Sequence, residues 1–128
     1  MLVQEQIDYY HEQGYLGVPD VLSEDEILAL RQVTDEFVEK SRAVTEHTDV
    51  FDLEPGHTPE NPKLRRLKSP IGQHEVYRKT LHNEKVLDIV SQLIGDGLRC
   101  NGNKLNMKQP GYGSPVEWHQ DWSFYPHT

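Results

Sequence analysis

Several features that would assign this chain to a particular class are missing from it. Cys100 is the single cysteine among the 128 residues, so no internal disulfide can form and a reducing compartment is expected. No apolar run approaches the ~20 residues that a membrane-spanning helix needs. The opening MLVQEQIDYY also lacks the basic stretch and long apolar run of a secretory signal. The sequence therefore predicts a soluble, cytoplasmic protein that has no membrane partner.

Basic residues are scarce in the first half of the chain. Residues 1–60 contain 15 acids and three bases, whereas residues 61–128 contain six acids and ten bases, and the formal net charge is −8. Proteins that bind nucleic acid need a basic stripe or patch, so we expect no nucleic-acid partner. The net positive second half is compatible with binding of a small anion.

Hydrophobic periodicity and capping residues predict helices in the first 96 residues. The predicted helices span residues 3–13, 23 to about 43, 73–81 and 83–94. Ser23 and Glu26 form the S-x-x-E pattern of a capping box, and Asn83 is a good N-cap for the last helix. On the second helix, one apolar stripe is formed by Ile27, Leu30, Thr34, Phe37 and Val38.

Strands are expected mainly after residue 97. LRRLKSP (64–70) favours a short strand, LRCNGNKLNMKQ (98–109) one strand or two joined at Gly102, and VEWHQDWSFY (116–125) a further strand. Residues 45–62, with three prolines and a glycine, are predicted to be a loop. Helices first and strands last indicate an α+β fold. We interpret residues 1–128 as one domain fragment, mainly helical over 1–96, with the strands in 97–128.

His119 and Asp121 are the candidate functional residues. Side chains two apart on a strand point the same way, so this pair could converge on one cation. One imidazole and one carboxylate are two of the three ligands that hold non-haem Fe(II) in oxygenases. The same pair is also typical of an ordinary hydrogen-bonded polar contact. The neighbouring aromatic residues suit either a small-molecule pocket or plain core packing: Trp118, Trp122, Phe124 and Tyr125.

Two stretches of the chain resemble a known family. EQIDYYHEQGYLGVPDVLSEDEILALRQ (5–32) and NMKQPGYGSPVEWHQDWSFYPHT (106–128) are similar to the phytanoyl-CoA dioxygenase-like family of Fe(II)/2-oxoglutarate-dependent oxygenases. The resemblance implies outer N-terminal helices packed on part of a double-stranded β-helix (a cupin-like jelly-roll), incomplete in this chain. It also implies a hydroxylase that uses 2-oxoglutarate and O₂ to oxidise a small-molecule substrate, such as an acyl-CoA or another metabolite.

The resemblance also assigns roles to individual residues. His119 and Asp121 match the first two iron ligands, and Gln120 matches a position that borders the cosubstrate. Lys68 resembles an upstream lysine that contacts 2-oxoglutarate. Lys108 matches a lysine before the loop, to which no role is assigned.

The family pattern continues with a second histidine and an arginine well downstream of the H-x-D motif, and we do not accept His127 as this third ligand. We therefore expect no turnover from the 128-residue chain alone. Three alternatives stay open: a truncated or degenerate non-catalytic member that acts as a binding or scaffold protein, a cupin-like metalloenzyme that adds Glu117 to the pair, and an acidic interaction module built on residues 24–43.

Overall fold

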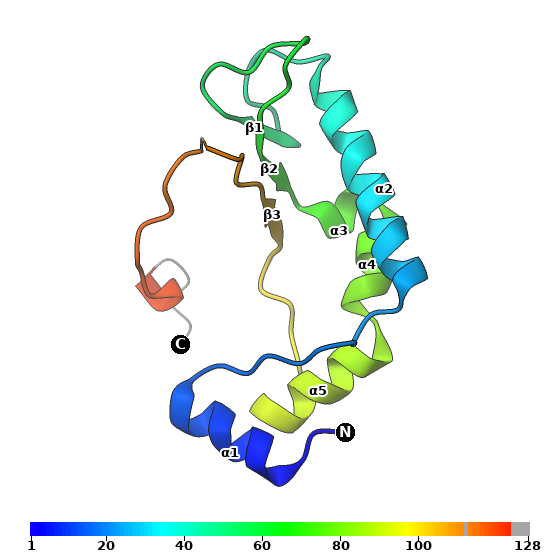
Figure 1. The fold of residues 1–128 in the computed structure, drawn as a ribbon, viewed down its shortest axis with the longest axis vertical. Coiled ribbons are helices and arrows are strands. Elements are labelled where there is room, and N and C mark those ends of the chain that lie inside the picture. Colours follow the sequence, from blue (N-terminus) through cyan, green and yellow to red (C-terminus); the bar gives the residue numbers. More distant parts are fainter. Residues whose placement is uncertain (112, 124–128) are drawn as a thin grey trace.

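In this computed structural model, which describes residues 1–111 and 113–123, some of the helices lie beside a small antiparallel sheet and the others lie at the far end of the molecule (Figure 1). The helices are α1 (Gln4–Gln13), α2 (Glu24–Ser41), α3 (Pro70–Gln73), α4 (Glu75–Leu81) and α5 (Glu84–Ile94). The strands are β1 (Phe51–Leu53), β2 (Leu64–Lys68) and β3 (Lys104–Asn106), and a 3₁₀ turn, η1, spans Asp121–Ser123. Helices with a short antiparallel sheet are an α+β arrangement, as predicted.

The predicted starts of α2 and α5 are confirmed, whereas the helix predicted from residue 73 begins at Glu75 as α4, after the separate helix α3. At the start of α2, the Ser23 hydroxyl accepts from the Glu26 amide (3.3 Å), and the Glu26 carboxylate accepts from the Ser23 amide (2.8 Å). The Asn83 side chain accepts from the amides of Lys85 and Val86, which caps α5. Asn83 also donates to the Glu26 carboxylate at 2.7 Å. One carboxylate thus ties together the starts of two helices that are far apart in the sequence.

The hydrophobic core lies where α2 and α4 meet the sheet. The Phe37 ring of α2 lies 6.3 Å from that of Phe51 and 6.2 Å from that of Tyr77, which joins α2, β1 and α4. Leu64 and Leu67 of β2 are fully buried. The buried hydrophobic residues are Val33, Phe37, Phe51, Leu53, Leu64, Leu67 and Tyr77.

The core side of α2 is rotated slightly from the predicted stripe. Val33, which the prediction left out, is buried, whereas Ile27 is 37% exposed. Leu30 and Val38 are partly buried against the core, as the predicted stripe requires. The side of α2 that faces the core therefore carries Val33, Phe37 and Ser41, and β1 and β2 supply its apolar partners.

The sheet corrects one prediction, because the segment 45–62 is not entirely a loop. It contains β1, which pairs antiparallel with β2, with Phe51 opposite Leu67. Phe51 and Leu53 are buried on either side of Asp52, so the strand follows the usual alternation. A three-residue strand is too short for that alternation to stand out among prolines and acids. On the other edge of β2, Leu105 of β3 also lies opposite Leu67.

The strand predicted at 116–125 is wrong over the part that the structure describes, 116–123. Residues 116–120 have no regular structure, and η1 follows them. A strand needs a neighbour for its backbone hydrogen bonds, but after β3 the chain turns through Gly111 and Gly113, both at positive φ, and leaves the sheet (Figure 1). Over 98–109, only the β3 residues form a strand.

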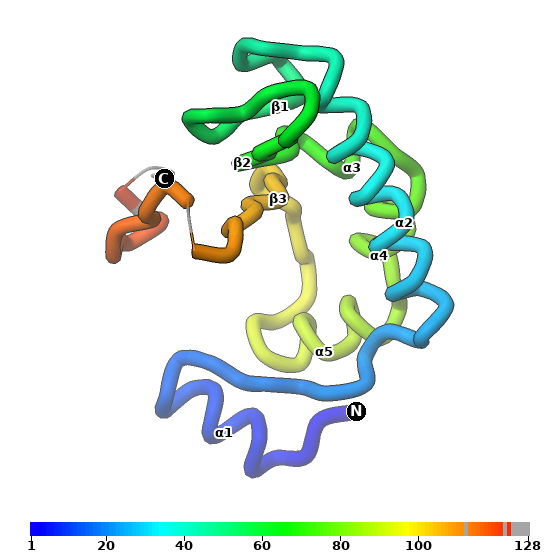
Figure 2. The backbone as a smooth tube through the Cα atoms, turned by 45° about the horizontal axis from the view of Figure 1, so that its top comes forward, coloured from blue at the N-terminus to red at the C-terminus, as the bar shows by residue number. Residues whose placement is uncertain are grey.

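Helices α1 and α5 lie at the opposite end of the molecule from β1 (Figure 1). Helices α1 and α5 lie side by side there (Figure 2), and the Leu2 amide donates to the Gln92 side chain at 3.0 Å. From the end of α5, the chain returns to the sheet as β3 (Figures 1 and 2). Within the described residues, every helix is too short or too polar to cross a membrane.

Candidate metal site

His119 and Asp121 lie against each other at the start of η1. His119 Nε2 is 3.2 Å from Asp121 Oδ1. The other ring nitrogen, Nδ1, is 2.7 Å from the backbone carbonyl oxygen of Glu117. The pair meets because the backbone turns into η1 at Asp121, not because two side chains share one face of a strand.

The carbonyl of Glu117 determines which ring nitrogen carries hydrogen. A carbonyl oxygen only accepts hydrogen bonds, so Nδ1 of His119 must be the donor. In the neutral imidazole, Nε2 then presents a lone pair to the Asp121 carboxylate. Two electron-rich atoms at this distance need a proton or a metal cation between them. Histidines that bind metals are oriented in this way, with the second nitrogen bonded to a carbonyl or carboxylate.

The spacing of the two atoms fits a shared metal ion. Donor atoms that bind one metal at right angles with bonds of about 2.1 Å lie about 3.0 Å apart. The observed Nε2–Oδ1 distance of 3.2 Å is close to that value. The His119 side chain is 37% exposed and that of Asp121 is 81% exposed, so the pair is open to solvent and to further ligands.

The rest of the donor set is not assembled around this pair. In residues 1–111 and 113–123, no three His, Cys, Asp or Glu side chains are grouped closely enough to hold a metal ion. This finding counts against a three-ligand site made by Glu117, His119 and Asp121. The expected aromatic wall is also absent at Trp118, whose side chain is fully exposed. The Trp122 side chain, Phe124, Tyr125 and His127 lie outside what the structure describes.

Lys68 and Gln120 have other contacts. The Lys68 ammonium is 2.9 Å from Asp52 Oδ1 and donates to the Thr48 carbonyl at 2.8 Å. Gln120 is exposed, and its backbone carbonyl accepts a hydrogen bond from the Ser123 amide of η1 at 3.1 Å. The described contacts of Lys68 are thus with β1 and the segment before it, whereas Gln120 lies beside the pair in the chain.

Sequence reasoning missed Glu54, a buried carboxylate with a 3% exposed fraction directly after β1. It accepts from the Ser114 amide at 3.0 Å and from the Ser114 hydroxyl at 2.6 Å. These two hydrogen bonds, followed by the positive charges of Arg65 and Lys108, lower the pKa of Glu54 below its ordinary value against the opposing effect of burial. No local pattern signals this role, because the partner is 60 residues away.

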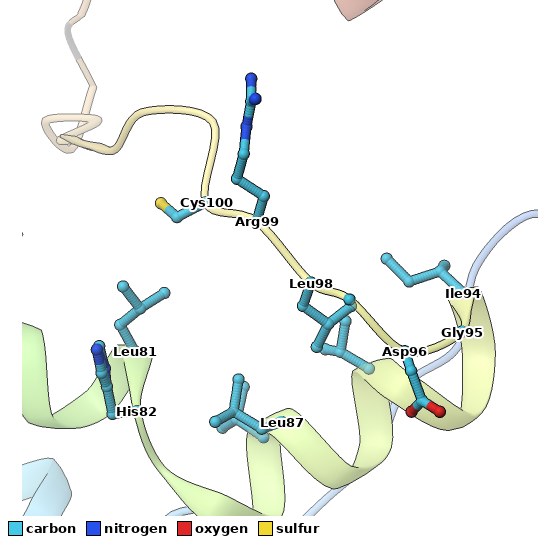
Figure 3. A pocket seen from close by; sticks show the side chains of 12 residues that line it. Leu81, His82, Leu87, Ile94, Gly95, Asp96, Leu98, Arg99 and Cys100 are labelled. Carbon is cyan, nitrogen blue, oxygen red and sulfur yellow. The ribbon is translucent and has the colours of Figure 1, made fainter.

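A separate apolar pocket of about 550 Å³ lies between α5 and the segment that follows it (Figure 3). Leu81, Leu87 and Leu98 contribute apolar walls, and the Arg99 side chain extends away from α5. None of the residues that line this pocket belongs to the H-x-D motif. The pocket and the candidate metal site are therefore made by different parts of the chain.

Comparison with known proteins decides the family. The sequence model of the phytanoyl-CoA dioxygenase (PhyH) family matches residues 10–128, which is most of the chain. The chain belongs to the phytanoyl-CoA dioxygenase family. The match includes the H-x-D motif and the loop before it.

The curated proteins that are similar to the chain carry several names. A probable alpha-ketoglutarate-dependent hypophosphite dioxygenase from Stutzerimonas stutzeri is 27% identical over the whole chain and 44% of its own length. A methylphosphonate hydroxylase from Gimesia maris is 29% identical over 94% of the chain and 44% of its own length. A phytanoyl-CoA dioxygenase from Arabidopsis thaliana is 30% identical over 96% of the chain and 54% of its own length. The chain spans about half the length of these relatives.

Proposed function

We propose that this chain is the N-terminal part of an Fe(II)/2-oxoglutarate-dependent dioxygenase that hydroxylates a small molecule. His119, through Nε2, and Asp121, through Oδ1, are its first two iron ligands. The supporting observation is that these two atoms face each other at 3.2 Å while Nδ1 donates to the Glu117 carbonyl. In that arrangement Nε2 faces the Asp121 carboxylate, which is the orientation expected of a histidine that shares a cation with a carboxylate.

Iron held in this way would supply open coordination positions for 2-oxoglutarate and O₂ and the oxidising power for C–H hydroxylation. The overall reaction consumes 2-oxoglutarate, O₂ and a substrate C–H bond and yields succinate, CO₂ and an alcohol. Within the chain, the Glu117 carbonyl holds the His119 ring in one tautomer and orientation. The Asp121 carboxylate would offset part of the positive charge of a bound metal ion.

Lys68 and Gln120 are the proposed cosubstrate-binding residues. The second half of the chain, with ten bases and six acids, suits a dianionic cosubstrate. Lys68 would exchange part of its contact with Asp52 for a carboxylate of 2-oxoglutarate. In this proposal, the helices and the three-stranded sheet are the outer part and first strands of a jelly-roll. The substrate is a small metabolite with a C–H bond, such as an acyl-CoA or an alkylphosphonate of the kinds named for two of the relatives.

A non-catalytic member of the family is the second candidate. It is favoured by the lack of a third His, Cys, Asp or Glu beside the pair within the described residues. In that case, the His119–Asp121 contact is an ion pair and the chain serves as a binding or scaffold protein.

Titration with Mn²⁺, followed by paramagnetic broadening of backbone amide signals, separates the two candidates. The iron-site proposal predicts broadening around His119 and Asp121 that is lost in His119→Ala and Asp121→Ala and kept in His11→Ala, a control at an exposed histidine of α1. Adding 2-oxoglutarate should tighten Mn²⁺ binding, and Lys68→Ala should remove that gain. Broadening that is unchanged in His119→Ala and Asp121→Ala would support the non-catalytic candidate.

A further inference from the structure

We propose that Glu54 and Lys108 are positioning residues that fix the loop leading into the H-x-D motif by holding Ser114. The statement that this loop positions the metal ligands rests on the proposed function. The hydrogen bonds that hold Ser114 do not depend on it. All three polar groups of Ser114 are engaged: its amide and hydroxyl donate to the Glu54 carboxylate, and its carbonyl accepts from the Lys108 ammonium. We call these three residues, Glu54, Lys108 and Ser114, the loop clamp.

Glu54 is a rigid base for this clamp. It directly follows β1, its amide donates to the Lys63 carbonyl at 2.8 Å, and its carbonyl accepts from the His57 amide at 3.1 Å. With 3% of its surface exposed, its charge is shielded from water. A buried carboxylate is costly unless its oxygens accept hydrogen bonds, and here Ser114 supplies one to each oxygen. The lowered pKa of Glu54 agrees with an ionised acceptor.

The loop between Lys108 and Ser114 needs contacts with the rest of the fold to fix its conformation. Gly111 and Gly113 have φ values of 67° and 148°, which residues other than glycine seldom adopt. Such glycines let the chain turn sharply, but they also leave many conformations open to it when nothing fixes it. A Cβ at Gly113 would lie 3.5 Å from the Gln109 amide nitrogen, so Gly113 lies in van der Waals range of the start of the loop.

Fixing Ser114 also restricts the conformation of the chain segment that leads to the proposed metal ligands. Pro115 follows directly, and a residue before proline is confined to extended conformations. His119 is five residues after Ser114, and the stretch between them has no regular structure. The hydrogen bonds of Ser114 thus tie the chain just before the H-x-D motif to the residue that follows β1. They also give a role to Lys108, to which the family resemblance assigns none.

The test uses the full 128-residue chain and two measurements. The first is hydrogen exchange at the Ser114 amide, compared with the Leu67 amide of the buried β2 strand. The second is Co²⁺ affinity, read from the visible absorption of the bound ion. The variants are Glu54→Gln, Ser114→Ala and Ser114→Thr, and Glu46→Gln is the matched control, because Glu46 is an exposed acid that borders the same 450 Å³ pocket as Glu54.

We expect Glu54→Gln to speed exchange at Ser114 at least tenfold, to leave Leu67 unchanged, and to weaken Co²⁺ binding about tenfold, the lower end of what loss of a ligand's supporting contact costs. Ser114→Ala should weaken Co²⁺ binding, and Ser114→Thr, which keeps the hydroxyl, should restore it. Glu46→Gln should behave as the wild type.

Two results would overturn the inference. Unchanged exchange at Ser114 in Glu54→Gln would show that the clamp does not hold the loop. Faster exchange with wild-type Co²⁺ affinity would show that the loop is held but does not position the ligands. If the wild-type chain gives no Co²⁺ spectrum, the proposed metal site and the positioning role fail together, while the exchange measurement still decides whether the clamp exists.

Discussion

At the scale of single residues, the chemistry of the candidate site depends on how the His119 ring is held. The Glu117 carbonyl accepts from Nδ1, and this contact turns Nε2 toward Asp121. The same two residues without that carbonyl would be free to adopt either tautomer. In the proposed iron site, the backbone of the motif, and not only its side chains, would therefore orient a metal ligand.

Glu54 gives a pH-dependent prediction at this scale. Hydrogen bonds from Ser114 lower the pKa of Glu54 in the folded chain, so the ionised form is the stabilised one. The stabilisation is complete above the pKa of the unfolded state and is lost as the pH falls through the lower, folded-state pKa. In urea unfolding at a series of acidic pH values, the wild type should lose stability more steeply than Glu54→Gln. Parallel pH profiles of the two proteins would contradict the assignment, and Glu46→Gln should follow the wild type.

The sequence anticipates the residues of the pair but not the geometry that joins them. The H-x-D spacing singles out His119 and Asp121, and strand alternation is the reason it gives for their convergence. The structure brings them together through the turn at η1 instead. Glu54 could not be anticipated at all, because a contact between residues 54 and 114 depends on how the chain folds back on itself.

At the scale of elements, local signals predict the longer helices well. They predict strands where β2 and β3 lie, but they miss β1, and the strand expected at 116–125 is absent over 116–123. Capping residues act on neighbouring amides, so Ser23 and Asn83 can be read from the sequence without knowledge of the fold. A strand depends on partners elsewhere in the chain. Phe51–Leu53 becomes a strand because β2 lies beside it, whereas residues 116–120 stay irregular although their composition favours a strand.

Ser23→Ala tests the capping box. The substitution removes the acceptor for the Glu26 amide and the donor to the Glu26 carboxylate. We expect the free energy of unfolding to fall by about 1 kcal/mol, measured by urea denaturation. Ser23→Thr keeps the hydroxyl and should lose much less. Equal losses in the two variants would show that the hydroxyl does not cap α2.

At the scale of the whole molecule, the central strand β2 connects the helices to the two outer strands. Leu67 of β2 is fully buried and lies opposite Phe51 on one side and Leu105 on the other. The segment that carries the candidate site leaves the sheet directly after β3 (Figure 1). The position of the H-x-D motif therefore depends on β2 and on the loop clamp together.

Leu67→Ala should destabilise the chain by about 2–5 kcal/mol, because it removes a buried side chain and leaves a cavity. The matched control is Leu28→Ala on α2, whose side chain is 59% exposed and should cost about 0.5 kcal/mol or less. Both values come from urea denaturation at neutral pH. A loss at Leu67 no larger than that at Leu28 would show that the sheet is not the centre of the fold.

The central claim is that His119 and Asp121 bind one metal ion, and a crystal structure of the chain soaked with Fe(II) under argon tests it most directly. Anomalous scattering at the iron edge should show one peak on the order of 2 Å from both His119 Nε2 and Asp121 Oδ1, the length of metal bonds to imidazole and carboxylate. The peak should be absent in Asp121→Ala. A His119–Asp121 contact that stays at its present distance with no iron beside it, or iron bound only elsewhere, would contradict the claim.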